Sequence, residues 1–349
     1  MKGKKKFFRN FIIFAILIVL TFYILLKDQN TTEIFNIVLS AKIEFIFIAI
    51  ACMMLYIICE AINIGRTLKA LNEKSSFFNN VKYALIGFFF SAITPAASGG
   101  QPMQIYYMHR DNISVANSTL ALLINLTSMQ IITIGFALVS VIFNYQNLNK
   151  ALVILFIVGI SLNLSALILL LISILSKRMS NGLINISIRI MKFFKIKNIE
   201  EKQEKLKNEL EKYQASSIYI KNNKFLIFKV LFTTAIQFVL YYSITYWTYC
   251  SLGLSGHTIV KIIALQALVY ASVSGIPSPG AVGVSEGAFI QIFSSVFSEG
   301  MISSAVLLNR GINFYLFVII SAVVVMIGQF KEKKQGRPEN NIDSENEPN

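Results

Sequence analysis

Long uninterrupted apolar runs dominate the pattern of hydrophobic and polar positions along the chain. Six of them approach or exceed the roughly 20 residues that cross a bilayer core as an α-helix. The predicted spans are Phe11–Leu26, Ile43–Ile64, Ala116–Phe143, Ala151–Leu175, Phe225–Cys250 and Met301–Gln329. Continuous runs of this kind exclude the alternating pattern of a membrane β-barrel. The pattern therefore predicts an all-α integral membrane protein, whose helices satisfy their own backbone groups in lipid.

Two further apolar segments, Lys82–His109 and Thr258–Ser298, are each interrupted by proline and glycine. Proline has no amide donor and glycine loosens the backbone, so a helix must break at both places. The stretch from Lys82 to the first break at Thr94 would form about 20 Å of helix, which is too short to cross the roughly 30 Å core. We therefore predict two broken re-entrant hairpins beside about six full transmembrane helices.

The distribution of charge supports this topology. Only 14% of the residues are charged, and the net charge is +14. Twelve of the 32 basic residues lie between Lys177 and Lys224, and more flank both ends of the chain. If each interrupted segment crossed the membrane once, this basic loop would lie outside, against the positive-inside rule. We expect a multi-pass cell-membrane protein with both termini in the cytoplasm, and the basic residues do not indicate nucleic-acid binding.

The segments outside the spans are short. Residues 1–330 are expected to form one membrane domain, with residues 176–224 as a cytoplasmic loop and 331–349 as a disordered tail. Within the loop, Leu183–Ile196 has the pattern of a membrane-surface helix and Ile199–Tyr213 that of a solvated amphipathic helix. The first span could alternatively be a secretory signal, but no cleavage site follows it. Three cysteines in apolar runs and two histidines indicate neither disulfides nor a metal site, and no cofactor is expected.

The two breaks carry the candidate site, because irregular backbone at membrane depth is tolerated only inside protein or beside water. They approach from opposite sides, which suggests an inverted repeat and resembles the binding sites of transporters. Helix ends at such breaks present free backbone donors, and the positive, N-terminal ends favour anionic groups such as phosphate. An ionisable side chain such as Glu286 costs free energy at membrane depth, which makes it a candidate functional residue, and Arg310 is its expected partner. Glu60 is a weaker candidate. The candidate residues are Thr94, Ser98, Gly99, Gly100, Gln101, Pro277, Gly280, Gly283, Glu286 and Arg310.

Within that set, the backbone amides of Gly99, Gly100, Gln101 and Gly283 are expected to be hydrogen-bond donors to a ligand. Simpler interpretations stay open. Each break could only kink a helix, and a pair between Glu286 and Arg310 could only hold the bundle together.

The breaks also resemble the membrane region of the lysylphosphatidylglycerol synthases, a family also called flippase-like. Residues 94–102, Thr-Pro-Ala-Ala-Ser-Gly-Gly-Gln-Pro, resemble its Thr-Pro…Gly-Gly-Glu/Gln-Pro motif. Residues 277–286, Pro-Ser-Pro-Gly-Ala-Val-Gly-Val-Ser-Glu, resemble its Pro-x-Pro-Gly-Gly-x-Gly-x-x-Glu motif, with Ala281 in place of the second glycine. Arg310 falls where the family has an arginine. The resemblance extends over roughly residues 10–330.

This resemblance implies two kinds of function. Full-length synthases carry an acyltransferase-like domain that transfers lysine from lysyl-tRNA to phosphatidylglycerol, and the membrane region is held to move the product between leaflets. The chain ends about 20 residues after its last span, without room for that domain. We therefore expect a translocase for an anionic or aminoacylated phospholipid such as lysyl-phosphatidylglycerol. The alternatives are a phosphatidylglycerol lysyltransferase, the membrane partner of a separate soluble synthase, or a non-transporting scaffold. A second copy of the chain is a further partner that the sequence allows.

Overall fold

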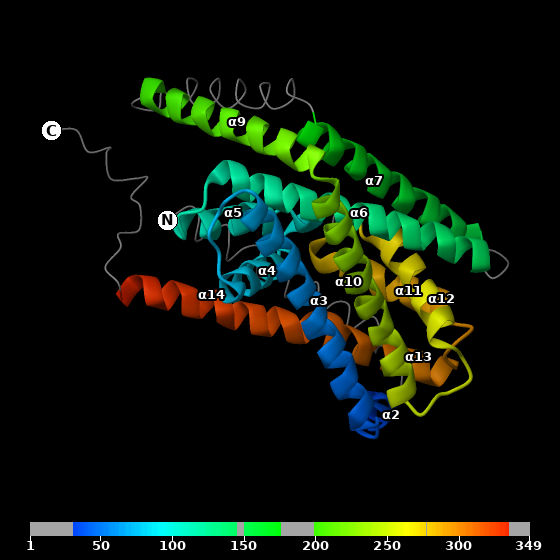
Figure 1. Ribbon diagram of the computed structural model, residues 1–349. Helices are drawn as coiled ribbons and strands as arrows, with labels where there is room; N and C mark the ends of the chain where they lie inside the picture. Colours follow the sequence, from blue (N-terminus) through cyan, green and yellow to red (C-terminus); the bar gives the residue numbers. More distant parts are fainter. Residues whose placement is uncertain (1–30, 145–149, 176–198, 277, 335–349) are drawn as a thin grey trace.

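The computed structural model describes residues 31–144, 150–175, 199–276 and 278–334, and these are helical with short connections (Figure 1). Five stretches are long and apolar enough to span a membrane: Ile43–Ala70, Val115–Ile142, Leu152–Ile174, Lys224–Ser251 and Gly300–Gly328. They correspond to five of the predicted spans, so the all-α membrane fold is confirmed. The remaining predicted span, Phe11–Leu26, lies outside the described residues, as does the predicted surface helix Leu183–Ile196. The predicted tail begins inside a helix, because the last helix continues to Lys334.

One order of elements occurs twice along the chain: a long helix, a short helix, a one-turn break, a second short helix and another long helical stretch. The first copy consists of α3 (Ile43–Ala70), α4 (Phe77–Ala92), η1 (Pro95–Ala97), α5 (Gly100–Arg110) and α6 (Val115–Asn144). The second consists of α10 (Lys224–Ser251), α11 (Ile259–Val273), η3 (Pro279–Ala281), α12 (Val284–Phe293), α13 (Glu299–Arg310), η4 (Gly311–Tyr315) and α14 (Leu316–Lys334). Helices α2 (Thr31–Leu39), α7 (Lys150–Leu175) and α9 (Ile199–Asn222) lie outside the two copies.

The two copies match in detail. Their first helices, α3 and α10, are 28 residues each and pack along one another at the centre of the molecule (Figure 1). In each copy the following short helix begins at a hydroxyl residue, Ser76 or Thr258, whose side chain accepts the backbone amide three residues on. Such a cap satisfies an amide that the first turn of the helix leaves free. The structure therefore contains the internal repeat that the two breaks suggested.

The copies point in opposite directions. We call the end of the bundle that holds the loops at residues 71–76 and 111–114 the basic end, because Arg66, Lys69 and Lys74 lie there. The hairpin of α4 and α5 returns to this end, where Lys82 Nζ lies 2.6 Å from Asp111 Oδ2.

The hairpin of α11 and α12 returns to the other end, where the Tyr249 ring contacts His257 before α11 and Phe297 after α12. Both re-entrant hairpins are thus confirmed. The turns η1 and η3 contact each other inside the bundle.

The last predicted span, Met301–Gln329, is not one regular helix. It consists of α13, a π-helical turn at Gly311–Tyr315 and α14. A π turn rotates the helical face and is found frequently at functional sites. Here it directly follows Arg310, and it places Phe314 against the second break.

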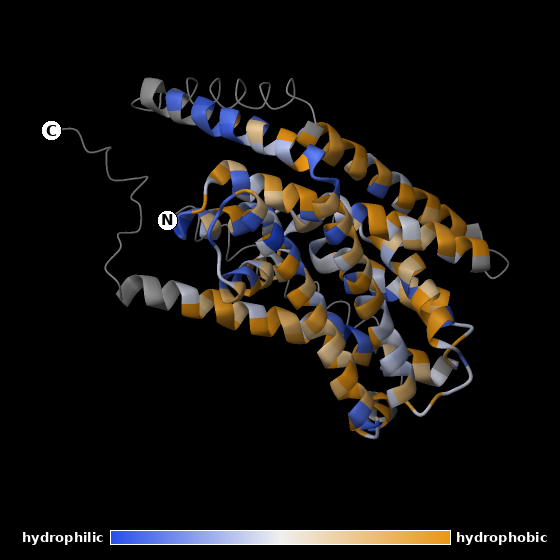
Figure 2. Cartoon of the chain, viewed as in Figure 1, coloured by the Kyte–Doolittle hydropathy of each residue, from blue (hydrophilic) through white to orange (hydrophobic). Residues whose placement is uncertain are grey.

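Helices α7 and α9 have contrasting surfaces. Seven large aliphatic residues of α7 between Ile154 and Leu169 are more than 36% exposed, as expected for a helix that faces lipid. Figure 2 shows α7 and α14 mostly orange, whereas α9 is the bluest long helix. Helix α9 extends from Ile199 to Asn222, well beyond the predicted Ile199–Tyr213, and contacts α6, α7 and α10. The amphipathic helix predicted in the basic loop is therefore present.

Candidate functional site

The two broken turns have the same backbone conformation over four residues. Each starts with an extended residue, Thr94 (φ −119°, ψ 143°) or Ser278 (φ −112°, ψ 145°), followed by a proline. The third residue is left-handed in both turns, with φ 51° at Ala96 and φ 60° at Gly280. The fourth residues, both alanine, also have positive φ, at 53° and 52°. Alanine rarely adopts this conformation, so both turns hold backbone strain.

The hydrogen bonds of the turns match as well. In the first turn, Ala97 N donates to Thr94 O and Ser98 N donates to Pro95 O, both at 3.2 Å. In the second turn, residues 281 and 282 donate to residues 278 and 279 at the same distances. The turns diverge afterwards, because Gly283 has φ 88° whereas Gly99 has φ −88°. The repeat therefore includes the breaks themselves, and only the residues that follow them differ.

The first break is fixed by Thr94 and by close helix packing. Thr94 Oγ1 donates to Phe90 O at 2.5 Å and accepts from Gly99 N at 2.9 Å. A Cβ on Gly100 would come within 2.1 Å of Ser91 Oγ, and one on Gly87 within 2.4 Å of Gln104 Nε2. The glycines therefore allow α4 and α5 to touch. Ser98 is exposed and Gln101 is half-buried.

The second break carries a buried ion pair. Glu286 and Arg310 are 2% and 7% exposed, and Arg310 Nε donates to Glu286 Oε1 at 2.8 Å. The other carboxylate oxygen, Oε2, accepts from Gly283 N at 2.7 Å, while Arg310 Nη2 donates to Gly280 O at 3.0 Å. Arg310 also lies 4.2 Å from the centre of the Phe314 ring. The predicted pairing of Glu286 with Arg310 is confirmed, and the pair ties α13 to the left-handed turn.

Two of the backbone amides predicted to be free donors are already occupied. Gly99 N is bound by its own Thr94, and Gly283 N is bound by Glu286 at the first turn of α12. A helix start leaves amides unsatisfied, and nearby side chains with accepting oxygens fill them first. In this conformation those two positions cannot bind a ligand through their amides. Pro277 lies outside the described residues.

A small cavity adjoins the ion pair. Besides Glu286 and Arg310 it is lined by Tyr241, Gln266 and Asn309, among others, and it has about the space of one water molecule. The Tyr241 and Tyr270 rings form one of its walls, with centroids 5.7 Å apart. In this conformation the site is therefore closed, polar and too small for a lipid headgroup.

Sequence reasoning missed a row of polar side chains on α10, which we call the α10 strip: Thr234, Gln237, Tyr241 and Thr245. These positions follow helical spacing and so share one face, which packs on α3, α6 and α11. Gln237 is fully buried, and neither of its amide atoms has a partner among the described residues. An unsatisfied buried polar group costs about 1–3 kcal/mol, so its presence requires a reason. The spacing of polar residues within Phe225–Cys250 was the available signal.

The α10 strip connects the ion-pair cavity with the basic end. Thr245 Oγ1 lies within 3.0 Å of Gln266 Oε1 and 3.2 Å of Asn309 Oδ1, and both of these residues line the cavity. Towards the basic end, Thr234 Oγ1 accepts from Asn63 Nδ2 at 3.0 Å. Polar groups thus continue through the bundle from one end to the ion pair.

Glu60, the weaker candidate, lies in the first copy. Its Oε1 accepts from Gln104 Nε2 at 3.4 Å, and Gln104 also donates to Tyr83 O at 3.1 Å. The structure therefore does not bring Glu60 into the pair of Glu286 and Arg310, but binds it to the first hairpin.

The fold and site together define a class: a multi-pass α-helical membrane protein with two equivalent, oppositely oriented broken hairpins that meet beside a buried ion pair. The family model described as "Lysylphosphatidylglycerol synthase TM region" matches residues 10–321. The chain belongs to this family. A search of the curated proteins gave no match.

Proposed function

We propose that the protein is a lipid translocase that moves an anionic or aminoacylated phospholipid, such as lysyl-phosphatidylglycerol, between the leaflets of the cell membrane. The main support is the contact between two equivalent broken turns that enter from opposite ends. A site between two such hairpins can be reached from either leaflet by small movements of one hairpin against the other. In this proposal the basic end is cytoplasmic, since the positive-inside rule places lysine and arginine there.

Arg310 is the proposed binding group for the lipid phosphate. Its guanidinium now binds the Glu286 carboxylate and the Gly280 carbonyl oxygen. Two oxygens of a tetrahedral phosphate can accept from one guanidinium, so a phosphate can replace the carboxylate on Arg310 without leaving a buried cation unpaired. Release of Glu286 would also free the Gly283 amide and loosen the second turn. Headgroup binding would thus open the closed site.

Leaflet labelling in reconstituted vesicles tests the proposal. Fluorescent phosphatidylglycerol in the outer leaflet is reduced by dithionite, and lipid that crosses during the incubation becomes accessible. Vesicles with the parent protein should expose more fluorescent lipid to dithionite than empty vesicles do. Glu286→Gln and Arg310→Ala should lose most of this activity. Lys261→Gln, at a position outside the site, is the matched control. If both site variants translocate as well as the parent, the site assignment fails.

The family description also names a synthase, which keeps phosphatidylglycerol lysyltransferase, or the membrane partner of a soluble one, as the second candidate. Mass spectrometry of lipids from expressing cells separates the two candidates. New lysyl-phosphatidylglycerol would favour the synthase activity, whereas a change in leaflet distribution alone would favour the translocase.

A further inference from the structure

An open groove of about 590 Å³ lies at the basic end, between the last turns of α3 and the first turns of α4. This volume is within the usual range for small-molecule sites. Three basic side chains line the groove: Arg66, Lys69 and Lys74. Gly65 lies at its base, where a Cβ would come within 2.2 Å of Asn80 Nδ2. The absence of a side chain there brings α3 and α4 together under the three cations.

Arg66 is held from one side only. Its hydrogen bonds within the described residues come from Nη1, which donates to Asn63 Oδ1 at 3.2 Å, Lys229 O at 2.8 Å and Thr233 Oγ1 at 2.9 Å. The three acceptors share the two hydrogens of Nη1 and fix the orientation of the planar guanidinium, and Nε and Nη2 remain for a further ligand. An arginine oriented in this way suits an acceptor with two oxygens, such as a phosphate.

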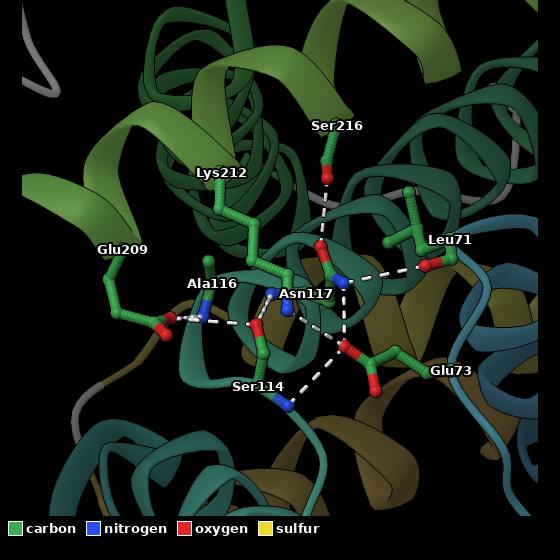
Figure 3. A network of polar contacts seen from close by, with 8 residues as sticks. All are labelled: Leu71, Glu73, Ser114, Ala116, Asn117, Glu209, Lys212 and Ser216. Carbon is green, nitrogen blue, oxygen red and sulfur yellow. Dashed lines mark hydrogen bonds and ion pairs between the residues drawn. The ribbon is translucent and has the colours of Figure 1, made fainter.

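Glu73, the acidic residue in the groove wall, does not neutralise these cations, because its carboxylate is hydrogen-bonded to other residues. Glu73 Oε1 accepts from Asn117 Nδ2 at 2.7 Å, from Ser114 N at 3.4 Å and from Lys212 Nζ at 3.4 Å (Figure 3). Lys212 belongs to α9, so this network holds α9 beside the groove. The groove therefore keeps a surplus of positive charge.

Aromatic side chains mark the lipid side of the groove. Phe77 lines it, and Phe77 and Phe78 are 48% and 82% exposed at the start of α4. Large apolar residues so exposed beside lysines are typical of the interface between lipid tails and headgroups. A lipid bound here would place its phosphate among the three basic side chains and its acyl chains along these aromatic rings.

The groove is also connected with the interior. Asn63, which accepts from Arg66, donates through Nδ2 to Thr234 Oγ1, the first residue of the α10 strip. Thr234 Oγ1 in turn lies 2.9 Å from Ser128 Oγ. A hydrogen-bonded chain therefore leads from the groove to the polar face that reaches the ion-pair cavity.

We propose that this groove is a binding site for the phosphate of an anionic phospholipid, which enters it from the leaflet at the basic end. Arg66 binds the phosphate in a fixed plane, Lys69 and Lys74 add charge, and the phenylalanines contact the acyl chains. Its role as the entry site of the transport path rests on the proposed translocase function.

Binding is tested on the full-length protein in neutral detergent, with dioleoyl phosphatidylglycerol as the probe and native mass spectrometry as the readout. Lys69→Gln/Lys74→Gln should lower the retained lipid about 25-fold, because each lysine near a lipid surface contributes about a factor of five. This double variant leaves the Arg66 contacts with α10 intact, whereas Arg66→Ala removes them and is expected to impair folding. Lys221→Gln, at an exposed position on α9 outside the groove, should retain as much lipid as the parent.

Inorganic phosphate and dihexanoyl phosphatidylglycerol, used as competitors, distinguish a free phosphate from a lipid. We expect the short-chain lipid to displace the probe at much lower concentration than phosphate, and Phe78→Ser to reduce that advantage. The groove proposal is overturned by equal retention in the parent and the double variant, by an equal loss in Lys221→Gln, or by equal competition from phosphate.

The two proposals fail separately. A parent that binds phosphatidylglycerol in the groove but moves no lipid in vesicles would keep the site and remove the translocase. A parent that moves lipid while the double variant binds and moves it equally well would keep the translocase and remove the groove.

Discussion

Arg310 donates from Nε to Glu286 and from Nη2 to the carbonyl oxygen of Gly280, so one guanidinium joins α13 to both sides of the second broken turn. The pair lies beside a cavity with about the space of one water molecule and is nearly inaccessible to solvent. Energetically such a pair is asymmetric, because loss of one partner leaves the other charge buried without compensation.

This asymmetry predicts non-additive effects on stability. Arg310→Met alone should lower the free energy of unfolding by about 3–5 kcal/mol, since it leaves the Glu286 carboxylate buried. The double variant Glu286→Gln/Arg310→Met should be more stable than Arg310→Met. Unfolding by denaturing detergent, with Glu286→Gln completing the cycle, measures the coupling. Additive losses would show that the two side chains do not act as a pair.

Gly280 is predicted to tolerate no side chain. It has φ 60°, and a Cβ there would lie 2.2 Å from Phe314 Cζ. Gly280→Ala should therefore destabilise the protein by about 2–4 kcal/mol, from backbone strain and overpacking together. Phe314→Leu in the same chain should recover part of this loss.

Gly287→Ala is the matched control, because its Cβ would meet nothing within 4 Å and α12 should gain about 1 kcal/mol in helix propensity. A Gly280→Ala variant as stable as this control would contradict the described turn.

The buried amide of Gln237 should separate stability from function. Gln237→Leu removes an unsatisfied polar group and should leave the stability equal or raise it by about 1–3 kcal/mol. If the α10 strip forms part of a headgroup path, the same variant should slow lipid movement severalfold in the vesicle assay. Val239→Gln, at an exposed position on the opposite face of the same helix, is the control. Unchanged transport in Gln237→Leu would exclude the strip from the path.

The orientation of the bundle can be read from single cysteines. Lys74 and Ser255 are exposed at opposite ends, and the native cysteines are buried or half-buried. In intact cells Ser255→Cys should react with a membrane-impermeant maleimide and Lys74→Cys should not. In inverted vesicles the reactivities should exchange. Labelling of Lys74→Cys in intact cells would place the basic end outside and remove the cytoplasmic assignment.

Much of this fold follows from the sequence, because span length, proline, glycine and lysine act locally. Apolar runs of sufficient length predicted the spans, and Pro95 and Pro279 with their neighbouring glycines predicted where the hairpins break. The distribution of basic residues predicted that each hairpin returns to its own end. Glu286 and Arg310 could be paired because few ionisable side chains lie within the apolar segments.

The remainder depends on which faces meet, and that is a tertiary property. The α10 strip becomes visible only when α3, α6 and α11 enclose one side of α10. The groove exists because Gly65 lets Asn80 approach, which no local pattern reveals. The amides of Gly99 and Gly283 were expected to be free, but side-chain partners three and five residues away occupy them. The π turn after Arg310 is likewise not visible in an apolar run of constant composition.

Helix α7 packs on α6 and α11, and its single crossing of the bundle has a consequence for the whole fold. Each copy of the repeat crosses the bundle twice, so it starts and finishes at the same end. Two such units joined directly would have the same orientation, and both hairpins would enter from one side. The single additional crossing by α7 makes the number odd and inverts the second copy. The turns η1 and η3 can therefore meet from opposite ends because one helix, α7, crosses the bundle between the two copies. That helix itself contributes few residues to the site.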